Sequence, residues 1–262
     1  MDANSTAEKP RRVVITGMGI LSPAGNNLED FWQGLVSGRS FVREVQAFDT
    51  SNMPIHSAGE VDNEPLLKSF SPTALKRTDR AVVLGLVAAD QALTDAGVLE
   101  HAQDGLPIGA VIGSGIGPCH YAEEAYLAYA DRGWHATRPT TIPRMMFNCI
   151  ASQISIKYHL TGFHYVVAAA CSSSSLAMVE AYDAVRSGRE NVILTGGCDS
   201  PLVPSIYGAW INLRILAKHP VPEKASRPFD KDRDGLVLAE GGAMLVFEEL
   251  EHAKARNAKI YG

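Results

Sequence analysis

The chain has 262 residues, of which 46% are hydrophobic and 20% charged, and its formal charge at pH 7 is −5. This composition is that of an ordinary globular protein, and the acidic balance argues against a nucleic-acid-binding protein, which needs an excess of Lys and Arg to attract phosphates. No apolar run approaches the ~20 residues that span a bilayer, and no secretory signal opens the chain. We therefore expect a cytoplasmic protein whose four cysteines are free thiols.

The first half of the chain contains one clear strand and two helical segments. The strand covers residues 12–17 and ends in glycine. Asn27 is placed to cap a helix that stops at Gly38. Ser71-Pro72 has the cap-then-proline order of a helix start and predicts one long helix that continues to Gly97.

The second half alternates strands and helices more regularly. In chain order, it predicts a strand at 108–113, a helix at 147–158, a strand at 165–169, a helix at 171–188, and strands at 191–196 and 243–247. The strand segments are almost continuously apolar, as is typical of strands covered on both faces. Alternating strands and helices imply crossover connections, so the sequence predicts a layered α/β fold with a mostly parallel sheet.

One cysteine is distinguished by its position. Cys171 follows an apolar strand and opens a predicted helix, and it is followed by a run of serines. Unpaired amides and the positive end of the helix dipole favour a thiolate at such a place. A thiolate nucleophile suits acyl transfer, because a thioester intermediate divides one difficult step into two easier ones. The alternative is a buried, inert cysteine, which we expect for the remaining three, Cys119, Cys149 and Cys198.

Several segments carry a resemblance to a known family. Ala-Cys-Ser-Ser-Ser at 170–174 resembles the nucleophile motif of the β-ketoacyl-acyl carrier protein synthases, in the thiolase superfamily. Further similar segments lie at 13–19, 21–26, 112–117, 195–197, and 226–235 followed by 240–243. Within the family, the elongating type II enzymes are the most similar. The resemblance implies a thiolase-like layered α/β fold with a mostly parallel mixed sheet, the first of two similar halves.

This resemblance also implies a reaction and a division of the chain. An acyl group moves from a carrier protein to Cys171, and a malonyl group on a second carrier then loses CO2 and attacks the thioester. Two histidines of the family's second half assist this step, but their motifs are absent here, so we name no catalytic histidine. Whether the chain is a fragment or receives its other half from a separate chain stays open. We expect a disordered lead-in over 1–11 and one domain over 12–262.

Other site residues follow from the same resemblance. Ile116 matches a residue that lines the acyl pocket, and Met146 lies in a segment, 143–148, that matches the dimer interface. Both are expected to bind substrate, and apolar core is the alternative for both. Basic residues at matching positions dock the acidic carrier protein, although a solvated surface is the alternative; they are Lys76, Arg77, Arg80 and Arg214. The charged segment 226–235 is expected to form a structural ion-pair network with Glu240 beneath it. No cofactor is implied, and no cluster has metal-ligand spacing.

Two rival functions remain. The first is a non-catalytic partner subunit like the chain-length factors, which typically replace the nucleophile that Cys171 supplies here. The second is another acyltransferase of the thiolase superfamily, against which the 226–235 segment argues. The sequence leaves undetermined the acyl chain length, the starter unit, a fatty-acid or polyketide pathway, and a homodimer or heterodimer as the assembly.

Overall fold

The structure is a computed structural model that describes residues 11–64, 70–100 and 106–262. Nearly all of the predicted lead-in, 1–11, therefore lies outside the described residues. Five strands form one sheet; in spatial order they are β1 (Val13–Leu21), β7 (Gly241–Glu249), β6 (Val192–Asp199), β4 (Gly109–Gly113) and β5 (His164–Val167). Each predicted strand is confirmed, with ends that differ by a few residues. A separate small ribbon pairs β2 (Arg43–Glu44) with β3 (Ser57–Ala58).

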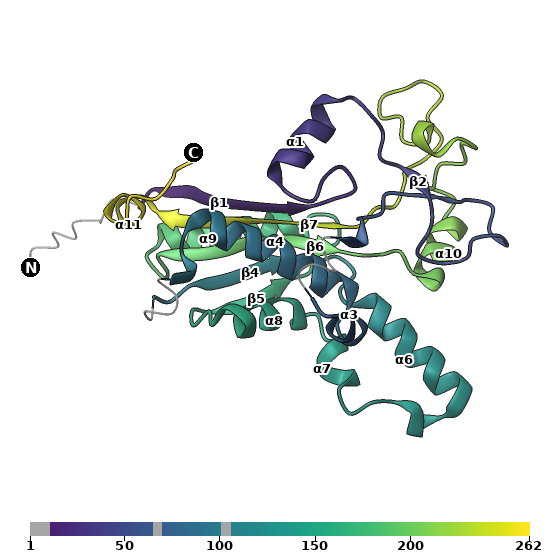
Figure 1. The fold of residues 1–262 in the computed structure, drawn as a ribbon, viewed down its shortest axis with the longest axis horizontal. Coiled ribbons are helices and arrows are strands. Elements are labelled where there is room, and N and C mark those ends of the chain that lie inside the picture. The colour runs from purple at the N-terminus through teal and green to yellow at the C-terminus, as the bar shows by residue number, and fades with distance from the viewer. Residues whose placement is uncertain (1–10, 65–69, 101–105) are drawn as a thin grey trace, which may run out of the picture.

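The sheet is mixed, and most of its strands run in the same direction. β4 is parallel to both β5 and β6, whereas β7 is antiparallel to both of its neighbours, β6 and β1. Only β7 is therefore reversed. Figure 1 shows β1 and β7 side by side although they come from opposite ends of the chain. The carboxyl ends of β4, β5 and β6 consequently meet at one edge of the sheet, where ligands bind in open α/β sheets.

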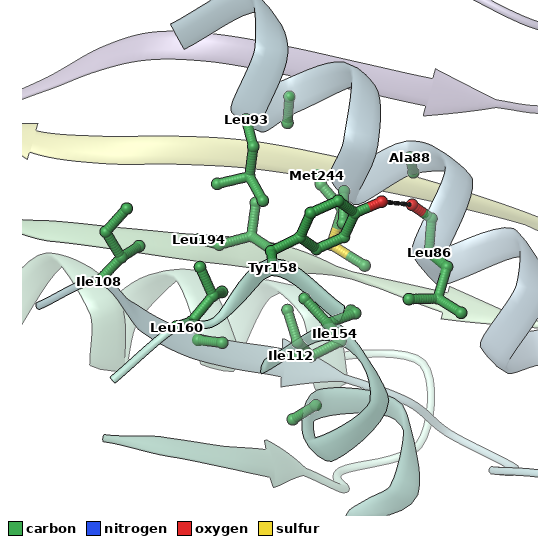
Figure 2. Packing of buried hydrophobic residues seen from close by; sticks show 14 of the residues in the cluster. Leu86, Ala88, Leu93, Ile108, Ile112, Ile154, Tyr158, Leu160, Leu194 and Met244 are labelled. Carbon is green, nitrogen blue, oxygen red and sulfur yellow. Dashed lines mark hydrogen bonds between the residues drawn. The ribbon is translucent and has the colours of Figure 1, made fainter. Parts of the chain in front are cut away.

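Helices cover both faces of the sheet. α4 (Arg80–Ala96) and α8 (Cys149–Tyr158) pack on one face, and α9 (Ser173–Arg186) packs on the other. On β4, Ile112 contacts the first layer and its neighbour Val111 the second, because successive side chains point to opposite faces. Figure 2 shows the first layer, where the buried Tyr158 donates a hydrogen bond to the carbonyl oxygen of Leu86 at 3.2 Å.

The prediction of a single long helix from Ser71 to Gly97 is wrong, because this segment forms two helices. Ser71 caps α3 (Pro72–Arg77), and α4 ends at Gly97, both as predicted; Gly97 has a left-handed conformation. Between them, the buried Asp79 caps α4 through the amide of Ala81 at 2.9 Å and also accepts the amide of Tyr121 at 2.8 Å. Since Tyr121 lies in the first turn of α6 (Cys119–Arg132), one carboxylate caps two helices.

The remaining elements lie around this core. α1 (Leu28–Val36) is capped by Asn27 as predicted. The sequence does not predict α6, α7 (Thr141–Met145), α10 (Pro204–Asn212), α11 (Leu250–Ala255), or the short 3₁₀ helices η1 (Trp134–Ala136) and η2 (Pro222–Lys224). In Figure 1, α6 and α7 extend away from the sheet. Among the described residues, no helix is both long and apolar enough to cross a membrane.

Candidate active site

Cys171 lies in the turn that joins β5 to α9, and it is the exposed member of the four cysteines. The helix begins at Ser173 with Ser172 as its N-cap residue, so Cys171 precedes the first helical turn by two positions rather than opening it as predicted. Burial raises the pKa of Cys119 and of Cys149 to about 12, and it raises the pKa of Cys198 as well. Among the four cysteines, Cys171 is therefore the one whose side chain is exposed to solvent.

Hydroxyl groups hold the turn around Cys171 in place. The hydroxyl of Ser172 donates to the carbonyl of Ala169 at 2.8 Å, and that of Ser173 donates to the carbonyl of Ala170 at 2.7 Å. The Ser173 hydroxyl also accepts the amide of Ala169 at 2.8 Å. Ala170 has a φ of +50°, a left-handed conformation that non-glycine residues rarely adopt. The serines thus satisfy backbone groups and stabilise a strained turn that presents Cys171 to solvent.

Glycines let the start of α9 sit directly on the strand ends. A Cβ atom at Gly113, the last residue of β4, would lie 2.4 Å from the backbone nitrogen of Ser174. A Cβ atom at Gly197 in β6 would lie 2.4 Å from the hydroxyl oxygen of the same serine. Both separations are far below van der Waals contact, so any side chain at these positions would displace the helix start and the adjacent Cys171.

A second loop lies against this turn. The carboxylate of Asp199, at the end of β6, accepts the hydroxyl of Ser114 at 2.8 Å and the amides of Gly115 at 2.8 Å and Ile116 at 3.1 Å. Ile116, expected to bind substrate, is half-buried in the middle of this loop. Sequence reasoning missed Asp199, although an acidic residue that ends a buried apolar strand is a usable signal.

The expected substrate residue Met146 lies in the segment next to this loop. A Cβ atom at Gly117 would lie 3.1 Å from the ring of Phe147, the residue after Met146. Met146 itself is 50% exposed, and Phe147 is 41% exposed. The structure thus brings the segments of Ile116 and Met146 together and leaves the Met146 side chain uncovered.

A cleft of about 1150 Å³ lies between α3, α4, α6 and α7. Its lining includes four arginines, Arg77, Arg80, Arg138 and Arg144, together with His120. Arg77 is exposed there, and Lys76 lies beside it on α3. Arg214 instead follows α10 and does not line this cleft. The basic residues expected to dock a carrier protein therefore do not all line this cleft.

Arg80, expected to dock a carrier protein, instead forms an ion pair with a buried carboxylate. Its guanidinium donates to Glu240 from Nε at 2.6 Å and from Nη2 at 2.5 Å, and the side chain of Glu240 is almost completely buried. Ser200 donates to the same carboxylate at 2.7 Å and contacts the ring of His120 at 2.8 Å. Burial alone would raise the pKa of Glu240, but hydrogen bonds and the charge of Arg80 hold the pKa below its usual value.

Glu240, which was expected beneath the ion-pair network of segment 226–235, is bonded to Arg80, Ser200 and the amide of Val61. Within that segment, Arg227 contacts Asp234 at 3.4 Å. Burial lowers the pKa of His120. In the part of the chain that the structure describes, no group of three or more His, Cys, Asp or Glu side chains is placed to hold a metal ion.

Comparisons with known proteins agree with this geometry. The family described as "Beta-ketoacyl synthase, N-terminal domain" matches residues 10–253. The 3-oxoacyl-(acyl-carrier-protein) synthase 2 of Coxiella burnetii is 38% identical over 253 residues, and a putative polyketide beta-ketoacyl synthase 1 of Streptomyces cyaneus is 34% identical over 258 residues. In both comparisons the match covers 96% of this chain and 61% of the relative.

A solved structure shows the same fold. The ishigamide ketosynthase/chain length factor superposes with a TM-score of 0.85 at 29% identity, and the match covers 96% of this chain and 61% of that chain. The chain thus spans about three fifths of the length of the proteins it matches. By its sequence, its thiolase-like fold and its exposed cysteine at the end of β5, the chain belongs to the β-ketoacyl synthase family, whose N-terminal domain it matches.

Proposed function

We propose that Cys171 is the acyl-accepting nucleophile of a β-ketoacyl-acyl carrier protein synthase that elongates fatty-acid or polyketide chains. The observation that carries this proposal is the exposure of Cys171 on a strained turn at the carboxyl edge of the sheet, while the other three thiols are buried. An exposed thiol there can reach a substrate without any rearrangement of the core. Relatives of this chain are named as synthases that act on acyl carrier proteins, which supports the same reaction.

The chemistry assigned to this chain is the formation of an acyl-enzyme. The sulfur of Cys171 attacks the carbonyl carbon of an acyl thioester, a new C–S bond forms, and the bond to the carrier's sulfur breaks, so the carrier leaves as its thiol after taking up a proton. The backbone amide of Cys171 is the expected donor to the transient oxyanion. In the complete enzyme, a malonyl carrier then loses CO2 and its carbanion attacks the acyl-Cys171 thioester.

The acid–base groups of the second step are proposed to come from the remainder of the enzyme. Four histidines among the described residues form ring hydrogen bonds, and their partners all lie outside the Cys171 turn; they are His56, His120, His219 and His252.

The outer face of α9 exposes apolar side chains, namely Leu176 (43%), Val179 (52%) and Tyr182 (40%). Because such an apolar stripe favours burial against another body, we assign this face to the second half of the synthase.

The proposed partners are an acyl carrier protein and a second ketosynthase-like subunit, in a cytoplasmic homodimer or heterodimer. Carrier docking is assigned to Lys76, Arg77 and Arg214, whereas Arg80 is held by Glu240 and serves the fold. Arg144, which lines the same cleft as Arg77, adds to the positive surface that would attract an acidic carrier, whereas Arg138 in that lining is paired with Glu124 at 3.6 Å. Charge reversal at Arg77 is expected to weaken carrier binding more at low than at high ionic strength.

Intact-protein mass spectrometry tests the acyl-transfer step directly. The chain is incubated with an acyl carrier thioester, and we expect a mass increase equal to the acyl group on Cys171. Cys171→Ala should abolish this increase, whereas the control Cys149→Ala, which removes a buried thiol, should retain it. If the wild-type chain accepts no acyl group, the rival reading, a chain-length-factor-like partner subunit, gains support.

Adding a malonyl carrier tests the division of labour. We expect residues 1–262 alone to form no ketoacyl product, because losing a preorganised stabilising donor typically costs about a hundredfold or more in rate. Turnover comparable to that of a complete synthase would show that the chain supplies its own acid–base groups, and the assignment of these groups to a second half would be wrong.

A further inference from the structure

The carboxylate of Asp199 is bonded to a single loop. It accepts the Ser114 hydroxyl and the amides of Gly115 and Ile116 at 2.8 to 3.1 Å. The Ser114 hydroxyl in turn accepts the amide of Gly117 at 3.0 Å, so the whole loop is tied to one side chain. The backbone of Asp199 is still paired with β7 through Gly241, which gives the carboxylate a rigid base.

The tethered loop, residues 114–117, lies between two parts of the candidate site. On one side, the amide of Ser114 donates to the carbonyl of Val167 at 3.1 Å, and a Cβ atom at Gly115 would lie 3.1 Å from the carbonyl oxygen of Ala170. Ala170 immediately precedes the nucleophile. On the other side, a Cβ atom at Gly117 would lie 3.1 Å from the ring of Phe147. Ile116, in the middle of the loop, is therefore fixed close to the Cys171 turn.

We propose that Asp199 is a positioning residue that fixes Ile116 beside Cys171 and thereby favours acyl groups with long apolar chains. The positioning of Ile116 by Asp199 follows from the contacts above, and the preference for long acyl groups rests on the proposed function. A carboxylate offers two oxygens to several donors at once, whereas an amide offers one oxygen and turns its own N–H groups toward the loop's donors. In Asp199→Asn, the new NH2 group faces either the amide of Gly115 or the donors of Ser114 and Ile116. At least one tether is then lost and the loop that holds Ile116 is loosened, although the volume of the side chain hardly changes.

Thiol alkylation tests this positioning independently of any enzymatic activity. The full chain reacts with iodoacetamide and with N-octyl iodoacetamide, and peptide mapping gives the rate at Cys171 for each reagent. In the wild-type chain, we expect contact between the octyl chain and Ile116 to favour the longer reagent, and a wild-type chain without this preference would contradict the proposal. Asp199→Asn should reduce the octyl preference at least about fivefold while the iodoacetamide rate stays within about twofold, because burial of several methylenes is lost but the thiol remains exposed.

Matched variants separate positioning from general damage. Asp95→Asn removes a carboxylate that accepts the backbone amide of Met18 at 3.0 Å, away from the Cys171 turn, and should leave the octyl preference unchanged. Ile116→Ala should reduce the preference as much as Asp199→Asn, and the double variant should lose no more than either, since both act through one contact.

Should Asp199→Asn fail to fold, Ser114→Ala removes one loop tether more gently and should lower the same preference. An octyl preference within about twofold of wild type in every folded variant of Asp199 and Ser114 would overturn the proposal. Failure of the proposed function would appear elsewhere, as absence of acyl transfer from a carrier thioester, while this alkylation test would still give its answer.

Discussion

Replacing Glu240 by Gln is expected to lower the free energy of unfolding by about 3 kcal/mol. Glu240 accepts two hydrogen bonds from Arg80, one from Ser200 at 2.7 Å and one from the amide of Val61 at 3.0 Å. Gln keeps only one accepting oxygen and leaves the guanidinium without a counter-charge. Breaking a buried ion pair costs about 3–5 kcal/mol, and we take the lower end because the Arg80 side chain keeps 23% of its exposure.

Urea unfolding followed by circular dichroism at pH 7 measures this loss. The control is Asp62→Asn, which breaks the pair between Arg43 and Asp62, whose side chains are 44% and 60% exposed. An exposed pair contributes under about 1 kcal/mol. If Glu240→Gln loses no more stability than Asp62→Asn, the buried pair does not hold this part of the fold and the reasoning is wrong.

The same variant has a defined pH dependence. Because Arg80 and Ser200 hold the pKa of Glu240 below its unfolded value of 4.5 despite burial, the carboxylate stabilises the fold above that pH and loses this contribution as pH falls through the folded pKa. The difference in stability between wild type and Glu240→Gln should therefore be constant near neutral pH and shrink below about pH 4.5. A difference that grew on acidification would have the wrong sign.

Three further outcomes are expected. Burial raises the pKa of Asp79 to about 6, above its unfolded value of 3.8, so its contribution to stability should fall as pH rises between these values. Asp79→Asn should remove this pH dependence of the free energy of unfolding, measured by urea titration at several pH values. Gly113→Ala should slow alkylation of Cys171 and destabilise the fold, whereas Gly208→Ala, where a Cβ atom meets nothing within 4 Å, should be neutral or stabilising by about 1 kcal/mol or less. Limiting iodoacetamide should label Cys171 first, and preferential labelling of a buried cysteine would contradict the assignment.

Local sequence determined much of this fold. The strand runs, the caps at Asn27 and Ser71 and the left-handed glycine at Gly97 depend on neighbouring residues, and each is found where its pattern predicts it. The position of Cys171 between a buried strand and a helix is equally local, and its error of two residues at the helix start is the usual uncertainty of helix ends. These signals sufficed to predict a layered α/β fold and to mark Cys171 as a candidate nucleophile, whereas the assignment of its role came from the family resemblance.

Tertiary structure alone decided which distant residues pair with one another. Arg80 and Glu240 are 160 residues apart, and Asp199 is 83 to 85 residues from the loop residues it holds, so no local pattern pairs them. Asp79 breaks a predicted long helix because it caps a second helix that approaches only in the folded state. Buried charges and amides must find partners wherever the fold brings them, and those partners are set by the packing of the sheet and its helices, not by sequence spacing.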